Sequence, residues 1–183
     1  MVLRVCKYGE AVLRRKAEPV AVVTDALRRL ADDMVETMHH ADGCGLAAPQ
    51  IGVSLRVAVV NGDVMEDVYP YLKGFRRTFI NPVVVSESET TCEYNEGCLS
   101  VPGVYADVRR PESITVEYYD ENLEKKTETF DKFAARMIQH EMDHLNGILF
   151  VDHASPIRRK MLSGKLQGIL KGKVHPHYNV KFK

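Results

Sequence analysis

The spacing of apolar side chains along the chain predicts three amphipathic helices. Apolar residues recur every three or four positions in three segments, at about residues 24–42, 131–147 and 155–171. Each segment opens with a side chain that can cap the N-terminus of a helix: Thr24, Asp131 and Ser155. We therefore expect an N-terminal helix, a C-terminal helix and a third helix between them.

Runs rich in β-branched and aromatic residues predict short strands between the helices. The expected strands cover residues 55–60, 79–85, 90–94, 114–119, 125–130 and 148–151. Residues 120–123 have the composition of a turn, which joins two of these strands into a hairpin leading into the second helix. Residues 61–77 are polar and irregular and indicate a loop, and residues 1–23 indicate an extended arm with a short turn.

The second helix carries the sequence His140-Glu141-Met142-Asp143-His144. Residues four apart lie one turn above each other on the same face of a helix, so the two imidazoles can bind one transition-metal ion. Glu141 would then lie beside the metal, where it can take a proton from a water molecule. The alternative is an ordinary helix with two surface histidines.

Two histidines leave such a site incomplete, because a catalytic zinc-like centre normally takes three protein ligands. Position 150, where one class of metalloprotease carries a further histidine, is Phe150, and no glutamate follows Glu141. Asp152 and His153 remain open as ligands, but they follow the helix and are expected to face away. Cys98, in a turn marked by glycine and proline, is the best third ligand because a thiolate binds first-row metals strongly. The alternative for Cys98 is a buried structural cysteine.

A second chemically suggestive segment is Gly43-Cys44-Gly45-Leu46-Ala47-Ala48-Pro49-Gln50. The glycines allow the backbone to approach a ligand closely, and the amide of Gln50 could donate to a developing oxyanion. Cys44 is expected to be a small wall residue rather than a nucleophile, because the sequence identifies no base to activate it. The alternative is a simple structural turn.

Composition narrows the class of protein. The chain has 183 residues, of which 45% are hydrophobic and 27% charged, with a formal net charge of zero. These values are typical of one globular domain, here residues 1–183, and they favour neither a nucleic acid nor a membrane as the main partner. The N-terminus has no signal-peptide hydrophobic region, and the four cysteines show no disulfide-rich pattern, so a cytoplasmic protein is expected.

Taken together, three segments closely resemble the peptide deformylase family. The motifs are GxGLAAPQ at 43–50, EGCLSVP at 96–102 and QHExDHLxG at 139–147, in the family's order and without departure. The resemblance implies an α+β fold in which antiparallel sheets pack around a central metal-binding helix, with an N-terminal and a C-terminal helix. It also implies a metal-dependent hydrolase that removes the N-formyl group from the N-terminal formylmethionine of newly made polypeptides and releases formate.

Carried over residue by residue, the resemblance makes Cys98, His140 and His144 the ligands of one divalent metal ion. Fe²⁺ is the family's usual metal, and Zn²⁺, Ni²⁺ or Co²⁺ can occupy the site. Glu141 would be the acid–base group.

The resemblance also implies a set of substrate contacts. Gln50 and the backbone N–H of Leu99 would stabilise the oxyanion. The backbone of Cys44 and Gly45 would pair with an extended peptide.

Four further residues are expected around this site. Met137 and Phe133 lie one and two turns before His140, respectively, on its face of the helix. They could line a pocket for the methionine side chain, although ordinary core packing is the alternative. Deformylases tend to carry an acid and an arginine at the places of Glu96 and Arg110, so we expect a pair that fixes the turn presenting Cys98.

The expected substrates are N-formylmethionyl nascent peptides, with no membrane and no sequence-specific nucleic acid as partner. A transient ribosome contact could use the basic side chains of the last helix, for which a plain solvated face is the alternative: Arg158, Arg159, Lys160 and Lys165. Beyond that helix, His175-Pro176-His177 is expected to belong to a loose polar tail.

Two other functions compete with the deformylase hypothesis. An endopeptidase of the His-Glu-x-x-His type would need a glutamate or histidine at a later position, which the sequence lacks. A non-catalytic, metal-stabilised binding module would usually add a fourth protein ligand and would leave Glu141 and Gln50 without a purpose.

Overall fold

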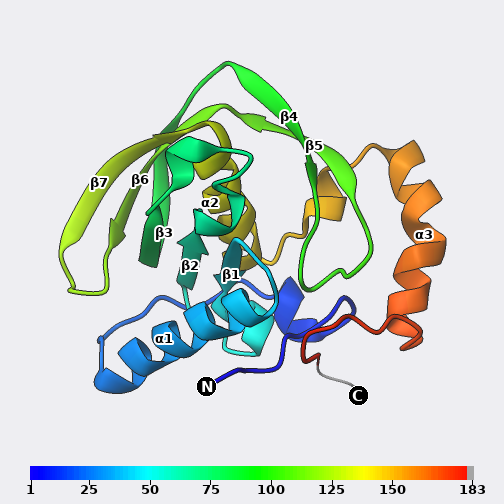
Figure 1. Cartoon of the computed structure of the whole chain (residues 1–183), viewed down its shortest axis with the longest axis horizontal. Helices are drawn as coiled ribbons and strands as arrows, with labels where there is room; N and C mark the ends of the chain where they lie inside the picture. The colour runs from blue at the N-terminus through cyan, green and yellow to red at the C-terminus, as the bar shows by residue number, and fades with distance from the viewer. Residues whose placement is uncertain (181–183) are drawn as a thin grey trace.

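The computed structural model describes residues 1–180 and has the expected α+β architecture (Figure 1). One sheet has five antiparallel strands in the order β1-β2-β3-β6-β7, and a second sheet pairs β4 with β5. The strands are β1 (Gly45–Ala47), β2 (Val57–Asn61), β3 (Arg76–Glu87), β4 (Thr91–Glu96), β5 (Ala106–Pro111), β6 (Ser113–Tyr119) and β7 (Lys125–Asp131). The predicted hairpin is present as β6 and β7, which pair from Ser113–Asp131 to Tyr119–Lys125.

Helix α2 (Lys132–Leu145) occupies the centre of the molecule, and the five-stranded sheet curves around it (Figure 1). Its apolar face packs against aromatic and aliphatic side chains of the sheet in the main core, where Ile138 and Leu145 meet Phe79, Val116 and Phe130. The helix ends as the sequence predicts: Gly147 has a φ of +73°, and a Cβ atom there would lie 2.7 Å from the carbonyl oxygen of Arg14. Glycine is therefore required both by the backbone conformation and by the close packing.

Helix α1 (Asp25–His40) covers the β1–β2 end of the sheet. The hydroxyl of Thr24 accepts a hydrogen bond from the backbone N–H of Leu27 at 3.3 Å, which confirms the predicted cap. Met34 and Met38 are fully buried against Leu46 of β1 within this part of the core.

Helix α3 (Pro156–Leu170) lies at the side of the molecule, beyond the β4–β5 sheet (Figure 1). Its predicted cap is present, since Ser155 accepts a hydrogen bond from the N–H of Arg158 at 3.2 Å. The helix buries only Leu162 and Ile169, whereas Ile157 and Met161 are 77% and 67% exposed. The expected apolar stripe of this helix is therefore only partly a core-facing stripe.

Several local expectations were wrong. Residues 148–151 do not form a strand, because the chain turns into a 3-10 helix (Phe150–His153) in which the Asp152 carboxylate accepts from the N–H of Leu149 at 2.9 Å. Asp131 stands at the N-cap of α2, but its side chain makes no capping hydrogen bond. The loop predicted at 61–77 does connect β2 to β3, and it contains two short 3-10 turns, Asp63–Met65 and Pro70–Leu72. Two further 3-10 turns lie elsewhere in the described residues, at Ala11–Arg14 and Ala48–Ile51. No helix in the described part of the chain has the length and hydropathy that a membrane crossing needs.

Candidate active site

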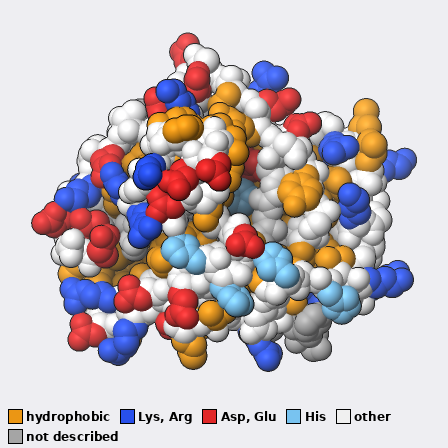
Figure 2. Space-filling model, viewed as in Figure 1, with side chains coloured by type: hydrophobic (Ala, Val, Ile, Leu, Met, Phe, Trp, Pro, Cys, Tyr) orange, Lys and Arg blue, Asp and Glu red, His pale blue; other side chains and the backbone are white. Residues whose placement is uncertain are grey.

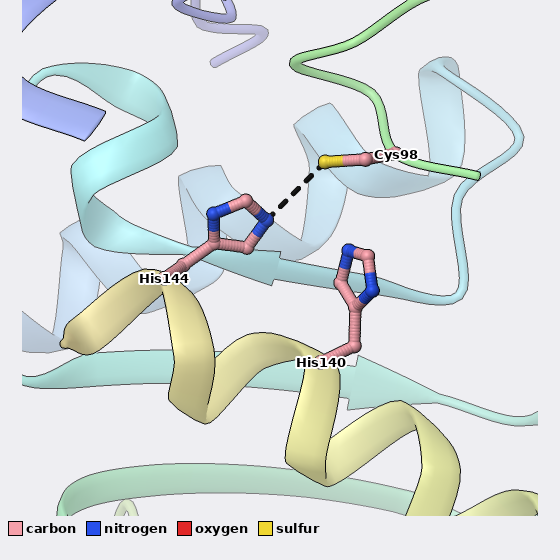
Figure 3. A group of neighbouring side chains, drawn as sticks. All are labelled: Cys98, His140 and His144. Atoms are coloured by element: carbon pink, nitrogen blue, oxygen red, sulfur yellow. Dashed lines mark hydrogen bonds between the residues drawn. The ribbon is translucent and has the colours of Figure 1, made fainter. Parts of the chain in front are cut away.

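Three potential metal ligands converge at the centre of the fold (Figure 3). His140 and His144 project from successive turns of α2, with ring centroids 5.1 Å apart, and Cys98 reaches them from the segment after β4. Their donor atoms all lie within 4.8 Å of one another. The Sγ atom of Cys98 is 3.2 Å from Nε2 of His144. The structure therefore brings together a helix and a distant turn that the sequence separates by about forty residues.

The surroundings of Cys98 favour its thiolate form. Burial by itself raises the pKa of this thiol, but the charge of His144 and hydrogen bonds with His140 and His144 outweigh that effect and lower the pKa to about 5. The backbone N–H of Ser100 also points at the sulfur at 3.4 Å. At neutral pH the site therefore offers a negatively charged soft donor beside two imidazoles.

This donor set fits a first-row divalent metal. Bond lengths of about 2.0–2.3 Å, as zinc makes to imidazole nitrogen and thiolate, put two donors roughly 3.5 Å apart in a tetrahedral site. The 3.2 Å between Cys98 and His144 is close to that separation. The pKa of His140 is raised well above its usual range: burial lowers it, but contacts with Cys98 and Glu96 outweigh this. The site therefore stabilises positive charge, as a cation-binding centre must.

A buried ionic network supports His140 from behind. Glu96 accepts hydrogen bonds from Arg110 at 2.8 and 3.0 Å and from Arg136 at 2.8 Å, and its Oε2 lies 2.9 Å from Nδ1 of His140. The predicted contact between Glu96 and Arg110 is therefore present. Arg110 also donates a hydrogen bond to Asp143 at 2.7 Å. Burial raises the pKa of Glu96, but its hydrogen bonds with Arg110 and His140 outweigh this effect, so the pKa of Glu96 lies well below its usual range.

Glu141 lies in the same pocket, with its carboxylate against the backbone of β1. A Cβ atom on Gly45 would lie 2.3 Å from Oε1 of Glu141, so only glycine leaves room for this carboxylate. Among the described residues, Oε2 of Glu141 has no hydrogen-bond partner although it is buried. Burial raises the pKa of Glu141 to about 7, against the opposing charges of His140 and His144. A carboxyl group with such a pKa can both accept and donate a proton near neutral pH.

Gln50 is held in one orientation at the edge of the site. Its Oε1 accepts from the N–H of Ala47 at 2.8 Å, so its Nε2 must point the other way. That Nε2 donates to Ser100 at 3.2 Å and lies 3.5 Å from the sulfur of Cys98. The side chain is buried, with 1% exposure, so its donor faces the cluster without competition from bulk water.

A pocket of about 570 Å³ opens onto these groups. Figure 2 shows a hollow near the centre of this face, with histidine side chains in it and along its rim. All four residues expected to contact substrate line the pocket: Cys44, Gly45, Phe133 and Met137. The pKa of Cys44 is raised to about 12 by burial and by the charge of Glu141, which makes its thiol a neutral wall rather than a nucleophile.

The alternative ligands are engaged elsewhere, because Asp152 binds Arg14 at 2.5 Å and His153 binds Asp143 at 2.7 Å. Sequence reasoning missed Arg136, which is buried in α2 and bonds the carbonyl oxygens of Val108 and Cys92 besides Glu96. An arginine in a helix is usually expected on the surface, and only its position one turn before His140 could have indicated a role at the site.

Comparisons with known proteins agree with this geometry. Residues 2–160 match the family model described as Polypeptide deformylase. A peptide deformylase of Cytophaga hutchinsonii is 42% identical over 182 residues, which cover 100% of this chain and 98% of that protein. A crystal structure of a peptide deformylase from Legionella pneumophila superposes with a TM-score of 0.83 at 39% identity, covering 94% of this chain and 98% of that one. A peptide deformylase structure from Plasmodium falciparum gives a TM-score of 0.84 at 35% identity, covering 92% and 96%. This chain therefore belongs to the peptide deformylase family, whose members are metal-dependent hydrolases that remove the N-formyl group from newly made polypeptides.

Proposed function

We propose that Cys98, His140 and His144 hold a single catalytic metal ion in this deformylase, and that this ion is Fe²⁺. The support is the convergence of a thiolate and two imidazoles, donors that suit first-row transition metals. Zn²⁺, Ni²⁺ or Co²⁺ would fit the same donors. Such an ion, when bound, polarises a carbonyl oxygen and makes a water molecule more acidic.

Glu141 is the acid–base group in this proposal. Water adds to the formyl carbon, and Glu141 takes one proton from that water. The C–N bond then breaks, Glu141 returns the proton to the leaving amine, and the products are formate and a free N-terminus. The pKa of about 7 suits both transfers, and Oε2, which has no hydrogen-bond partner among residues 1–180, is the atom available to carry the proton.

Gln50 and the backbone N–H of Leu99 are proposed to stabilise the tetrahedral oxyanion. The support for Gln50 is its fixed amide, whose Nε2 points toward Cys98. Leu99 directly follows Cys98 and lines the same pocket. Because these donors would be in place before the reaction, they would not need to reorganise as charge develops.

The peptide is proposed to lie along β1, with its methionine side chain in the pocket. β1 is the edge strand of the five-stranded sheet, and the backbone of Cys44 and Gly45 can pair with an extended peptide there. Phe133 and Met137 line the pocket and would contact the thioether. Formyl is the smallest acyl group, so the space at the ligand cluster between Gln50, the N–H of Leu99 and Glu141, which line one pocket, is proposed to select it by size.

The single observation that carries this proposal is the convergence of Cys98, His140 and His144 beside a pocket that Glu141 lines together with Cys98 and His140. The test is metal analysis of the purified protein combined with an assay of formate release from a formyl-Met peptide. Stoichiometric metal with formate release supports the proposal. Metal without formate release would favour the binding module, and cleavage of internal peptide bonds would favour the endopeptidase.

We further propose that residues 1–183 act as one catalytic domain in the cytoplasm, where formylated chains are made. None of the four cysteines, all of which lie within residues 1–180, forms a disulfide bond, which suits a reducing compartment. A transient ribosome contact would use α3, whose exposed face combines basic side chains with the uncovered Ile157 and Met161. Ribosome cosedimentation of a variant with its four basic residues replaced by Ala tests this contact, and unchanged cosedimentation would indicate a plain solvated face.

A further inference from the structure

The chain beyond α3 does not form the loose tail that its sequence suggests. Residues 174–178 alternate between half-buried and exposed positions, as in an extended strand, with Val174, Pro176 and Tyr178 turned inward. All five residues line the pocket that contains Glu141 and Cys98. In Figure 1 this segment, coloured red, runs from α3 back beneath the connection between β4 and β5. It lies outside residues 2–160, the part of the chain that matches the family model.

Hydrogen bonds hold the segment against the site at its far end. The hydroxyl of Tyr178 donates to the carbonyl oxygen of Leu99 at 2.7 Å. One residue further on, the carbonyl of Asn179 accepts from the N–H of Val5 at 3.0 Å, and Val180 forms a parallel bridge with Val5. Tyr178 therefore contacts the residue that directly follows the proposed metal ligand Cys98.

A second contact joins the segment to the opposite wall of the pocket. Nε2 of His177 lies 3.2 Å from the carboxylate of Asp42, which immediately precedes the Gly43–Gly45 stretch leading into β1. Both side chains are largely exposed, at 64% and 85%, so this ion pair adds little to stability. The more buried hydrogen bond between Tyr178 and Leu99 therefore holds the segment in place. The contact between His177 and Asp42 lies at the mouth of the pocket, where its two walls meet.

We propose that residues 174–178 form one wall of the substrate groove, with His177 contacting the residues that follow the formylmethionine and Tyr178 holding that wall in place. This inference rests on the proposed function. A peptide lying along β1 has Asp42 and Cys44 on one side and the tail on the other. Each further residue extends the peptide by about 3.3–3.6 Å, so the second and third residues would pass the rim of the pocket, where His177 and Asp42 meet. The ligand class is therefore a formylated peptide of at least three residues, held along its backbone by polar groups.

The test compares two substrates in the full-length, metal-loaded enzyme. A formyl-Met tripeptide reaches the rim, whereas formyl-Met amide ends before it and serves as an internal reference. The readout is the ratio of kcat/KM for the long substrate to kcat/KM for the short one. His177→Ala and Tyr178→Phe should each lower this ratio by about 3- to 10-fold, the effect of losing roughly one hydrogen bond. The loss should appear mainly in KM for the tripeptide, which a general weakening of the fold would not produce.

Asn179→Ala is the matched control, because Asn179 lies in the same segment but its side chain does not line the pocket. Its ratio should equal that of the wild type. Wild-type ratios in both His177→Ala and Tyr178→Phe would overturn the proposal, and if Tyr178→Phe fails to fold, the exposed His177 alone decides the matter. Absence of formate from formyl-Met amide with wild-type enzyme would instead contradict the proposed function and leave a different signature.

Discussion

Oε2 of Glu96 lies 2.9 Å from Nδ1 of His140, and this contact determines which ring nitrogen of His140 can bind a metal. Because Nδ1 is engaged by the carboxylate, Nε2 is the atom left for the ligand cluster. Arg110 and Arg136 hold the same carboxylate from other sides, so the ring orientation is fixed by three elements: the end of β4, β5 and α2. The supporting groups of a metal site tune its affinity in this way.

Glu96→Gln should lower metal affinity by about 10- to 100-fold, because the amide keeps the shape of the side chain but removes the charge that orients His140. Competition with a chelator measures the affinity. Glu93→Gln is the matched control, since Glu93 lies on the same strand with its side chain 54% exposed. Equal affinity in Glu96→Gln and wild type would show that the network supports the fold alone.

Cys98→Ala, His140→Ala and His144→Ala should each lose both metal and activity, because each removes one of only three proposed protein ligands. Elemental analysis of the purified variants measures the metal content. Cys92→Ala controls for the loss of a thiol, since Cys92 lies outside the ligand cluster. Stoichiometric metal in Cys98→Ala would remove Cys98 from the site.

Glu141→Ala should keep its metal and its fold but lose turnover by about 10²–10⁴-fold, the usual range for a general acid–base group. Activity should fall because the variant lacks the carboxylate that is proposed to transfer the proton. The metal should stay because Glu141 is not one of the three converging ligands. Circular dichroism, metal analysis and initial rates separate these properties. Activity within a few-fold of wild type would assign the proton transfer to another group.

Gln50→Ala should lower kcat by about 10²–10³-fold, with a smaller change in KM, because its donor is aimed at charge that is present mainly in the transition state. Steady-state kinetics on a formyl-Met peptide measure both constants. A change confined to KM would make Gln50 a substrate-positioning residue instead.

Much of the site could be predicted from the sequence because its chemistry is local. The four-residue spacing of His140 and His144 defines a shared helix face, and Cys98 lies in a turn with its own glycine and proline signals. The helix caps at Thr24 and Ser155 are local too, and both are present.

The features that sequence reasoning missed depend on tertiary contacts. β1 consists of glycine, leucine and alanine, with little strand preference, and exists because it pairs with β2. β5 alternates correctly, but its buried positions include Arg110, which hides the pattern. The apolar run at 148–151 is buried by a 3-10 turn, which satisfies the same burial without a strand partner. The tail after α3 is ordered by Leu99 and Val5, which lie far away in the sequence.

The most direct test of the proposed function compares kcat/KM for matched formyl-Met, acetyl-Met, formyl-Ala and blocked internal peptides, using metal-replete enzyme kept from oxygen. Formyl-Met should be cleaved efficiently and the internal peptide not at all. Acetyl-Met should be cleaved far more slowly, because its methyl group adds volume between Gln50, the N–H of Leu99 and Glu141. Relative to formyl-Met, formyl-Ala should lose about 1–3 kcal/mol of transition-state stabilisation, seen as a lower kcat/KM, because its side chain leaves the space beside Phe133 and Met137 unfilled. Comparable rates on formyl and acetyl substrates would contradict selection by size, and cleavage of the internal peptide without formate release from formyl-Met would contradict the proposed activity itself.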